Sequence, residues 1–178
     1  MTKPIKFAAL GIEHRHIFGM SQNMLNAGAE FAGWWTEGEP EVVEGFLKRF
    51  PDVPRMTSVE DVLADPTIDL VLIADVPKNR ADLAIRAMDA GKDVMSDKPG
   101  CTTLAQLERL REAVARTKRI WSVNFSERFE VPSVTKATEL VAAGAIGRVV
   151  QTIGMGPHRL NRALRADWFF DREAYGGI

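Results

Sequence analysis

Leu70-Val71-Leu72-Ile73-Ala74 is the stretch of sequence that decides the fold. Its apolar residues run without alternation, which is typical of a strand buried on both faces of a parallel sheet. A helical pattern follows, with apolar side chains three and four residues apart, and Gly91 ends it. The next apolar run, residues 93–96, is again a strand candidate. Residues 70–96 therefore predict a strand–helix–strand unit with a right-handed crossover.

The same alternation extends in both directions along the chain. Further strand candidates are residues 5–10, 31–35 and 120–124, and helical patterns cover residues 17–24, 43–50, 58–63, 104–114 and 132–143. Strands alternating with helices indicate an α/β fold of Rossmann type, in which helices cover both faces of a doubly wound parallel sheet.

The pattern changes after residue 125. We expect residues 1–125 to form the Rossmann domain, and residues 126–178 to hold a bridging helix and the N-terminal part of an α+β second domain. Within this second part, residues 149–153 read as a strand. The final residues, Tyr175-Gly176-Gly177-Ile178, complete neither a helix nor a strand. We therefore expect the second domain to be incomplete.

Composition excludes several classes of protein. With 23 Lys and Arg against 24 Asp and Glu, the net charge of −1 argues against a nucleic-acid groove or an anionic membrane surface as the main partner. The chain has one cysteine, Cys101, which excludes a disulfide framework and favours a reducing compartment. The longest apolar runs are much shorter than the roughly 18 residues that a membrane span requires. We expect a cytoplasmic protein.

The turn after the first strand is where a doubly wound sheet binds its ligand. It reads Gly11-Ile12-Glu13-His14-Arg15-His16, and of the three glycines in a dinucleotide fingerprint only Gly11 is present. Glu13 adds a negative charge where a pyrophosphate would approach, whereas the basic side chains of residues 14–16 would compensate at a helix N-terminus. A metal site is the less favoured alternative, because two histidines in a turn have no third ligand nearby in the sequence. We predict no metal.

Two later strand ends carry charged residues that suit cofactor chemistry. Glu37 follows the second strand, where an acid commonly binds the adenosine ribose hydroxyls and repels a 2′-phosphate, although a solvated loop acid is the alternative. Ser96-Asp97-Lys98-Pro99-Gly100 follows the fourth strand. A lysine there is placed to reach a bound ligand and to act as an acid or base, although a surface Lys-Pro turn is commoner.

Several segments together resemble one known family. GKDVMSDKPGCTTLAQLERL (91–110) is similar to the AGKHVxxEKPLxxTxxEAxxL segment of the glucose-fructose oxidoreductase, inositol dehydrogenase and MocA-type oxidoreductases. DPTIDLVLIADVPKNRADLAIRAM (65–88) resembles DVDAVxIATPxxxHxExAxxAL, and residues 119–150 resemble the N-x-R-F turn and GxIGxV passage. Residues 166–178 are similar to the approach to the family's D-x-G-x-H motif. The resemblance covers nearly all of the chain.

The resemblance implies a nicotinamide-dependent oxidoreductase acting on a sugar, inositol or similar polyhydroxy substrate. Lys98 would be the catalytic lysine, which orients the substrate hydroxyl and assists its proton transfer. Asp97 would stand for the motif's glutamate near the nicotinamide, and Glu37 would favour NAD over NADP. The remaining cofactor contacts would come from Gly11, Ile12, Glu13, His14, Arg15, His16, Asp75, Val76 and Arg80. Asn124 and Arg128 would line the substrate site with Lys98, and Trp168 would close it.

Departures from the family pattern support a second hypothesis. The family's Thr-Pro and following His become Asp75-Val76 and Arg80, the motif's glutamate becomes Asp97, and the sequence ends before D-x-G-x-H. We therefore expect this chain alone to be inactive. The resemblance implies that the full-length form is a homo-oligomer. The alternative is a non-catalytic nucleotide- or sugar-binding module, or a regulatory remnant of the family.

Overall fold

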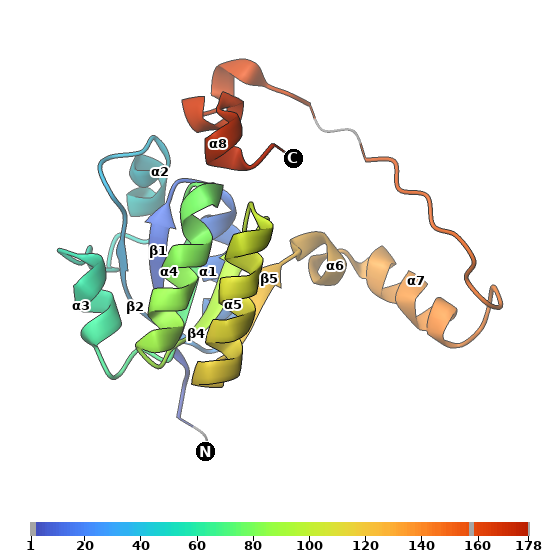
Figure 1. The fold of residues 1–178 in the computed structure, drawn as a ribbon, viewed down its shortest axis with the longest axis horizontal. Helices are drawn as coiled ribbons and strands as arrows, with labels where there is room; N and C mark the ends of the chain where they lie inside the picture. The colour runs from blue at the N-terminus through green and yellow to red at the C-terminus, as the bar shows by residue number, and fades with distance from the viewer. Residues whose placement is uncertain (1–2, 157–158, 178) are drawn as a thin grey trace. The chain divides into compact units, whose positions relative to one another are not determined.

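The computed structural model describes residues 3–156 and 159–177, apart from the side chain of Phe129. Its centre is one five-stranded parallel sheet with the strand order β2-β1-β3-β4-β5 (Figure 1). The strands are β1 (Lys6–Ile12), β2 (Glu30–Trp35), β3 (Leu70–Ala74), β4 (Asp93–Asp97) and β5 (Trp121–Asn124). The five strands predicted within residues 1–125 are confirmed, as is the Rossmann-type fold class.

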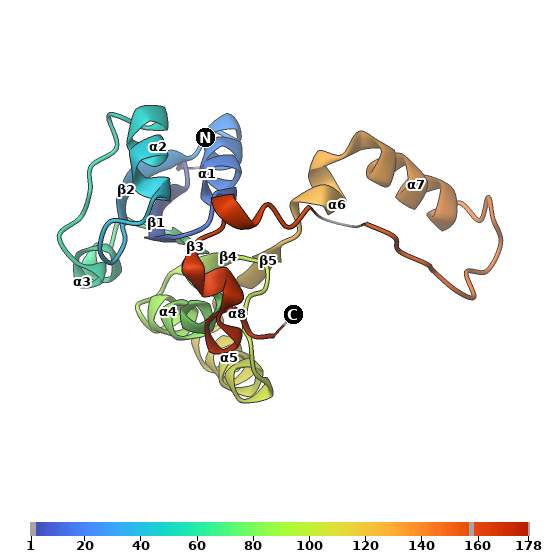
Figure 2. The ribbon, with the colours of Figure 1, turned by 90° about the horizontal axis from the view of Figure 1, so that it is seen from above.

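Helices cover both faces of this sheet. They are α1 (His16–Asn26), α2 (Val42–Arg49), α3 (Val59–Ala64), α4 (Pro77–Asp89) and α5 (Leu104–Thr117). Seen from above, α1 and α2 lie on one side of the sheet and α4 and α5 on the other (Figure 2). The helices follow local signals: Ser58 and Asp61 form a capping box at the start of α3, and Thr103 Oγ1 accepts the Gln106 amide at the start of α5.

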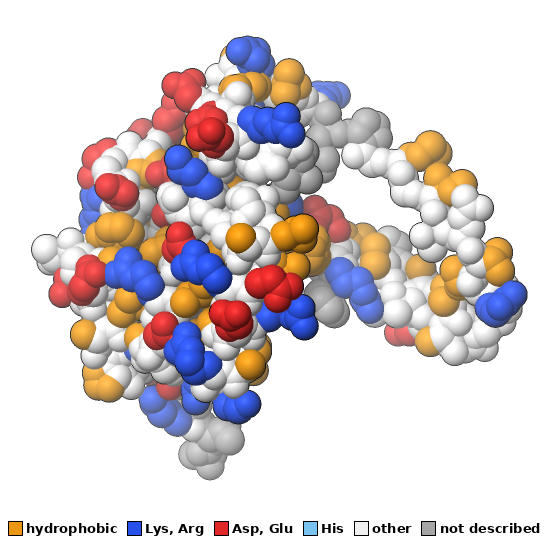
Figure 3. Space-filling view, viewed as in Figure 1, with side chains coloured by type: hydrophobic (Ala, Val, Ile, Leu, Met, Phe, Trp, Pro, Cys, Tyr) orange, Lys and Arg blue, Asp and Glu red, His pale blue; other side chains and the backbone are white. Residues whose placement is uncertain are grey.

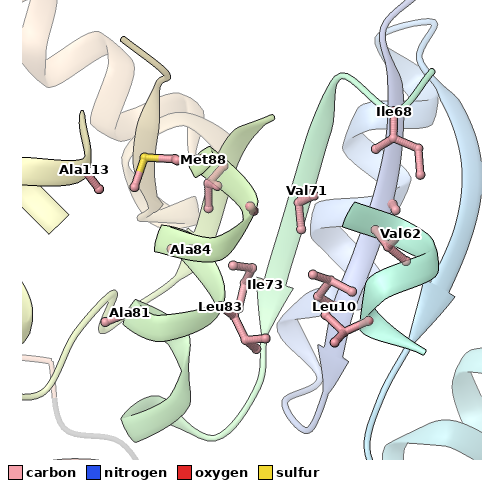
Figure 4. Close-up of a cluster of buried hydrophobic side chains, with 14 of the residues drawn as sticks. Leu10, Val62, Ile68, Val71, Ile73, Ala81, Leu83, Ala84, Met88 and Ala113 are labelled. Atoms are coloured by element: carbon pink, nitrogen blue, oxygen red, sulfur yellow. The ribbon is translucent and has the colours of Figure 1, made fainter. Parts of the chain in front are cut away.

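Each face has its own apolar core. On one face, side chains of β1 and β3 such as Leu10 and Ile73 pack against α3, α4 and α5 (Figure 4). On the other face, alternate residues of the same strands, such as Phe7 and Leu72, pack against α1 and α2. Because successive strand residues point to opposite faces, a continuous apolar run fills both cores at once.

The direction in which successive strands are added to the sheet reverses between β1 and β3. The chain proceeds from β1 outward to β2 and then returns to β3 on the other side of β1, so the loops after β1 and β3 diverge. This topological switch point creates the crevice at the carboxyl ends of the strands where such folds bind ligands.

Residues after β5 divide between two compact units. One unit is Met1–Asn124 with Ala166–Ile178, which includes η2 (Asp167–Phe170) and α8 (Arg172–Tyr175), and the other is Phe125–Arg165. The second unit contains α6 (Ser126–Glu130), α7 (Pro132–Ala142) and η1 (Arg162–Leu164). The assignment of residues 126–178 to a second domain stays a prediction.

The strand expected at residues 149–153 is wrong. These residues have no regular secondary structure, and Val150 and Ile153 are largely exposed. A segment rich in β-branched residues forms a strand only when a neighbouring strand takes up its backbone hydrogen bonds, and no described residue pairs with this segment.

The described surface agrees with the near-zero net charge. On the face seen in Figure 3, acidic and basic side chains are interspersed. Among the described residues, no helix has the length and apolar character needed to cross a membrane.

Gly11 provides a test of the packing at the switch point. Its φ is +71°, and a Cβ added there would lie 2.3 Å from the Cβ of Asp75. Gly11→Ala should therefore lower the free energy of unfolding by about 2–4 kcal/mol in urea denaturation. The matched control is Gly19→Ala in α1, where no heavy atom lies within 4 Å of the added Cβ. That variant should gain about 0.5–1 kcal/mol. Equal stability of the two variants would contradict this account.

Candidate functional site

The turn from β1 to α1 is fastened to the end of β3. The backbone N–H groups of Glu13 and His14 both donate to the carbonyl oxygen of Ala74, at 3.2 and 3.0 Å. On the other side, the Ile12 N–H donates to Thr36 Oγ1 at the end of β2, at 2.9 Å. The turn therefore joins the carboxyl ends of three adjacent strands, and two of its amides are used within the protein.

Two carboxylates lie at this junction. Asp75 directly follows β3, is buried, and accepts a hydrogen bond from Asn79 Nδ2 at 2.8 Å. Burial raises the pKa of Asp75. Burial and the nearby charge of Asp75 together raise the pKa of Glu13, with a smaller opposing contribution from the Trp168 indole. The turn thus carries two carboxylates, which a phosphate-binding turn usually lacks.

Arg80 joins the ends of β3 and β4 and is 1% exposed. Its Nε donates to the carbonyl oxygen of Asp75 at 2.7 Å, and its Nη1 donates to the carbonyl oxygens of Lys98 and Pro99 at 2.8 and 3.1 Å. Its Nη2 lies 3.2 Å from Oδ2 of Asp97. The guanidinium fork thus fixes two strand ends in a geometry that a lysine could not satisfy.

Asp97 is the last residue of β4, and its side chain is fully buried. His16 Nδ1 lies 2.8 Å from Oδ1, and His14 Nδ1 lies 3.0 Å from Oδ2. The Lys98 N–H also donates to Oδ1, at 2.8 Å. The sequence places no third group near the two histidines, but the folded chain brings the Asp97 carboxylate beside both imidazoles. The third group comes from β4, which is remote in sequence but ends at the same edge of the sheet.

The electrostatic state of this cluster follows from its geometry. Burial by itself would raise the pKa of Asp97, but the imidazoles of His14 and His16 and the charge of Arg80 outweigh it and hold the pKa well below its usual range. Burial lowers the pKa of His14, with Asp97 opposing the shift. Asp97 is therefore ionised at neutral pH, and the His14 imidazole is neutral there.

Lys98 lies where the fourth strand ends and is half-buried. Its backbone is held on both sides, since its N–H donates to Asp97 and its carbonyl oxygen accepts from Arg80. Asn124 ends the neighbouring strand and pairs in register with Asp97. The two polar residues expected near a substrate, Lys98 and Asn124, thus lie at the ends of adjacent strands.

Glu37 lies apart from this cluster, after the end of β2. It is exposed and lines an open pocket of about 470 Å³ with Thr36, Gly38 and Arg55. Arg55 forms an ion pair with Glu39, and its Nη2 donates to the carbonyl oxygen of Gly38 at 2.8 Å. Sequence reasoning missed Arg55, because it lies in a loop outside any strand end or motif.

Aromatic rings cover His14 from the chain's last segment. Trp168 and Phe169 of η2 stack on each other with centroids 3.8 Å apart, and their centroids lie 6.3 and 5.7 Å from that of His14. In the same segment, α8 contacts α4. Trp168 was expected at the site, whereas Phe169 had no signal in the sequence.

The other expected site residues lie as follows. Arg15 is exposed at the N-cap of α1, Val76 is the N-cap of α4, and the Ile12 side chain belongs to an apolar core. Arg128 lies on α6 in the second compact unit. The structure therefore gathers Glu13, His14, His16, Asp75, Arg80, Asp97, Lys98 and Trp168 around one edge of the sheet, with Glu37 at the end of β2.

Comparisons with known proteins identify relatives. Residues 15–125 match the family described as "Oxidoreductase family, NAD-binding Rossmann fold". A crystal structure of a putative oxidoreductase from Erwinia carotovora atroseptica is 46% identical, with a TM-score of 0.92 over 97% of this chain and 51% of that one. D-xylose 1-dehydrogenase (NADP(+)) of Hypocrea jecorina is 33% identical over 62% of this chain and 29% of its own length. scyllo-Inositol 2-dehydrogenase (NAD(+)) of Bacillus subtilis is 33% identical over 51% of this chain and 26% of its own length.

The chain thus spans less than a third of the length of these two curated relatives, and about half of the similar crystal structure.

Removing the charge of Asp97 tests the role of the buried cluster. Asp97→Asn leaves Arg80 buried without its carboxylate, so the free energy of unfolding at pH 7 should fall by about 3 kcal/mol in urea. Because folding depresses the pKa of Asp97, its stabilisation is complete above the unfolded-state pKa of about 4 and is lost as the pH falls below it. The difference in the free energy of unfolding between the wild type and Asp97→Asn should therefore become smaller at acidic pH.

The control is Asp89→Asn, which makes the same chemical change in the exposed Asp89–Arg116 ion pair. It should cost less than about 1 kcal/mol. A loss as small as this for Asp97→Asn would show that the cluster does not hold the strand ends together.

Proposed function

Because the chain belongs to the oxidoreductase family with an NAD-binding Rossmann fold, we propose that it is the cofactor-binding part of a nicotinamide-dependent oxidoreductase that acts on a sugar, inositol or similar polyhydroxy compound. The observation that carries the proposal is Lys98, half-buried at the end of β4 beside the end of β5. Named relatives that act on D-xylose and on scyllo-inositol support the substrate class.

The residues fit a nicotinamide dinucleotide best at the adenosine end. Glu37 is exposed beside the pocket after β2, so its carboxylate is available to accept hydrogen bonds from ribose hydroxyls. The N-terminus of α1, an eleven-residue helix, carries no acidic residue in its first turn and so favours the pyrophosphate. When bound, the nicotinamide supplies the acceptor for the two electrons and the hydrogen that leave the substrate carbon.

The protein's own part in the chemistry falls to Lys98 and its supports. We assign to Lys98 the orientation of the reacting hydroxyl and assistance in removing its proton. Arg80 and Asp97 are positioning residues, because they hold the carbonyl oxygen and the N–H of Lys98. Asn124 would hydrogen-bond a second hydroxyl from the adjacent strand, and Trp168 would exclude water from the crevice.

Cofactor preference gives a direct test. Titration with NADH, followed by its fluorescence, should show saturable binding to the chain, and Glu37→Ala should weaken it about fivefold to tenfold. The same variant should bind NADPH more tightly, since the charge that repels a 2′-phosphate is gone. Glu39→Ala removes a neighbouring acid that is paired with Arg55 and should leave NADH affinity within about twofold of wild type. Absence of saturable binding at millimolar NADH contradicts the proposal.

A second test separates chemistry from binding. In a form of the protein that turns over a polyhydroxy substrate, Lys98→Ala should lower kcat by a factor of about 10² to 10⁴. The affinity for NADH should change less than about twofold, because the lysine acts on the substrate rather than on the cofactor. Lys78→Ala on the exposed face of α4 is the control and should retain full activity. Retained turnover in Lys98→Ala would remove this residue from the reaction.

A non-catalytic nucleotide- or sugar-binding module is a second candidate, favoured by one observation. The carboxylates of Glu13 and Asp75 lie at the turn, and the amides of Glu13 and His14 are already bonded to Ala74. Both features weaken the grip on a pyrophosphate. If this candidate holds, sugars or nucleosides without phosphate will bind as tightly as NADH, and Glu13→Gln will not improve NADH affinity.

A further inference from the structure

Two imidazoles and one carboxylate converge at the start of α1. The ligand atoms of His14, His16 and Asp97 all lie within 4.8 Å of one another. Both histidines present Nδ1, and each faces a different oxygen of the same carboxylate, at 2.8 and 3.0 Å. Within residues 3–156 and 159–177, this is the group of three such side chains that is close enough to hold one ion.

Two atoms of this cluster are buried without a hydrogen bond. Nδ1 of His14 and Oδ2 of Asp97 have almost no accessible surface and make no hydrogen bond of normal geometry to any described residue. A buried polar atom that makes no hydrogen bond destabilises the folded state. A cation between the imidazoles and the carboxylate would satisfy both atoms, because a neutral imidazole nitrogen and a carboxylate oxygen are metal ligands.

The types of the ligand atoms favour a particular class of ion. Two imidazole nitrogens and one carboxylate are the ligand set of many sites for divalent iron, cobalt or nickel. The ligand atoms of these three side chains lie within 4.8 Å of one another, a spacing that one ion can bridge.

The charges around the cluster also suit a divalent ion. Glu13 precedes His14, and Asp75 follows Ala74, the residue whose carbonyl oxygen binds the turn. Together with Asp97 these residues bring three carboxylates to the junction, against the single guanidinium of Arg80 that contacts Asp97. Arg80 is held by three carbonyl oxygens, so it can remain beside a coordinating carboxylate as an outer-shell ion-pair partner.

We propose that His14, His16 and Asp97 form a binding site for one divalent first-row transition-metal ion at the carboxyl edge of the sheet. Water or an oxygen ligand of a bound compound would complete the coordination of the ion. The proposal does not depend on the proposed function, since the three side chains are present whether or not a nicotinamide binds.

Calorimetric titration of the chain with cobalt or nickel chloride, after removal of metals with a chelator, tests the proposal. We expect one ion per chain with a Kd below about 100 μM. The bound ion should also raise the Tm, because it binds the folded chain at a site that unfolding destroys.

Single variants identify the ligands. His14→Gln and His16→Gln should each weaken binding about tenfold or more, and at equal metal concentration the rise in Tm should be smaller in each variant than in the wild type. The control is His158→Gln, which removes the third and last histidine of the sequence and should leave the affinity unchanged. Far-ultraviolet circular dichroism of the metal-free variants checks that they are folded.

Two results would overturn the proposal. One is the absence of saturable binding to the wild-type chain at about 1 mM metal. The other is one-to-one binding that survives in the double variant His14→Gln/His16→Gln. NADH titration of the metal-free chain is independent of both, so failure of the metal site and failure of the proposed cofactor site can be told apart.

Discussion

The buried carboxylate of Asp97 is the group on which the arrangement of the site depends. Arg80 contacts it from α4, and His14 and His16 contact it from the β1–α1 turn. An ionised carboxylate without access to water must be paired, and these three side chains stabilise it. The same contacts fix the relative positions of the turn, α4 and the residue that follows β4, which is Lys98.

The β1–α1 turn differs from a glycine-rich phosphate turn in the groups that fix its conformation. Glycines allow close approach of a pyrophosphate to backbone amides. Here only Gly11 is retained. A glycine is needed at this position because φ is positive and an added Cβ would collide with Asp75. The amides of Glu13 and His14 bind Ala74 instead. The turn is therefore shaped by side chains and by β3, which gives it carboxylate and imidazole groups that could serve a nicotinamide, a metal ion or both.

Most of the fold was predictable because its signals are local. Continuous apolar strands such as 70–74 and helix caps such as Ser58 need only a few neighbouring residues to be recognised. The strand expected at 149–153 failed because a strand needs a pairing partner, which no local pattern supplies. Lys98 and Glu37 were predicted as site residues from their positions after strand ends, whereas Arg55 and Phe169 carried no such signal.

The sequence by itself determined the order of strands and helices, the parallel sheet and therefore the edge at which ligand-binding residues gather. Periodicity and capping fix these features within short windows. Only the tertiary structure decided which side chains meet at that edge. His16 and Asp97 are 81 residues apart, yet their side chains lie 2.8 Å from each other. Strand ends far apart in sequence become neighbours once the sheet forms, and spacing along the chain does not encode the distance between them.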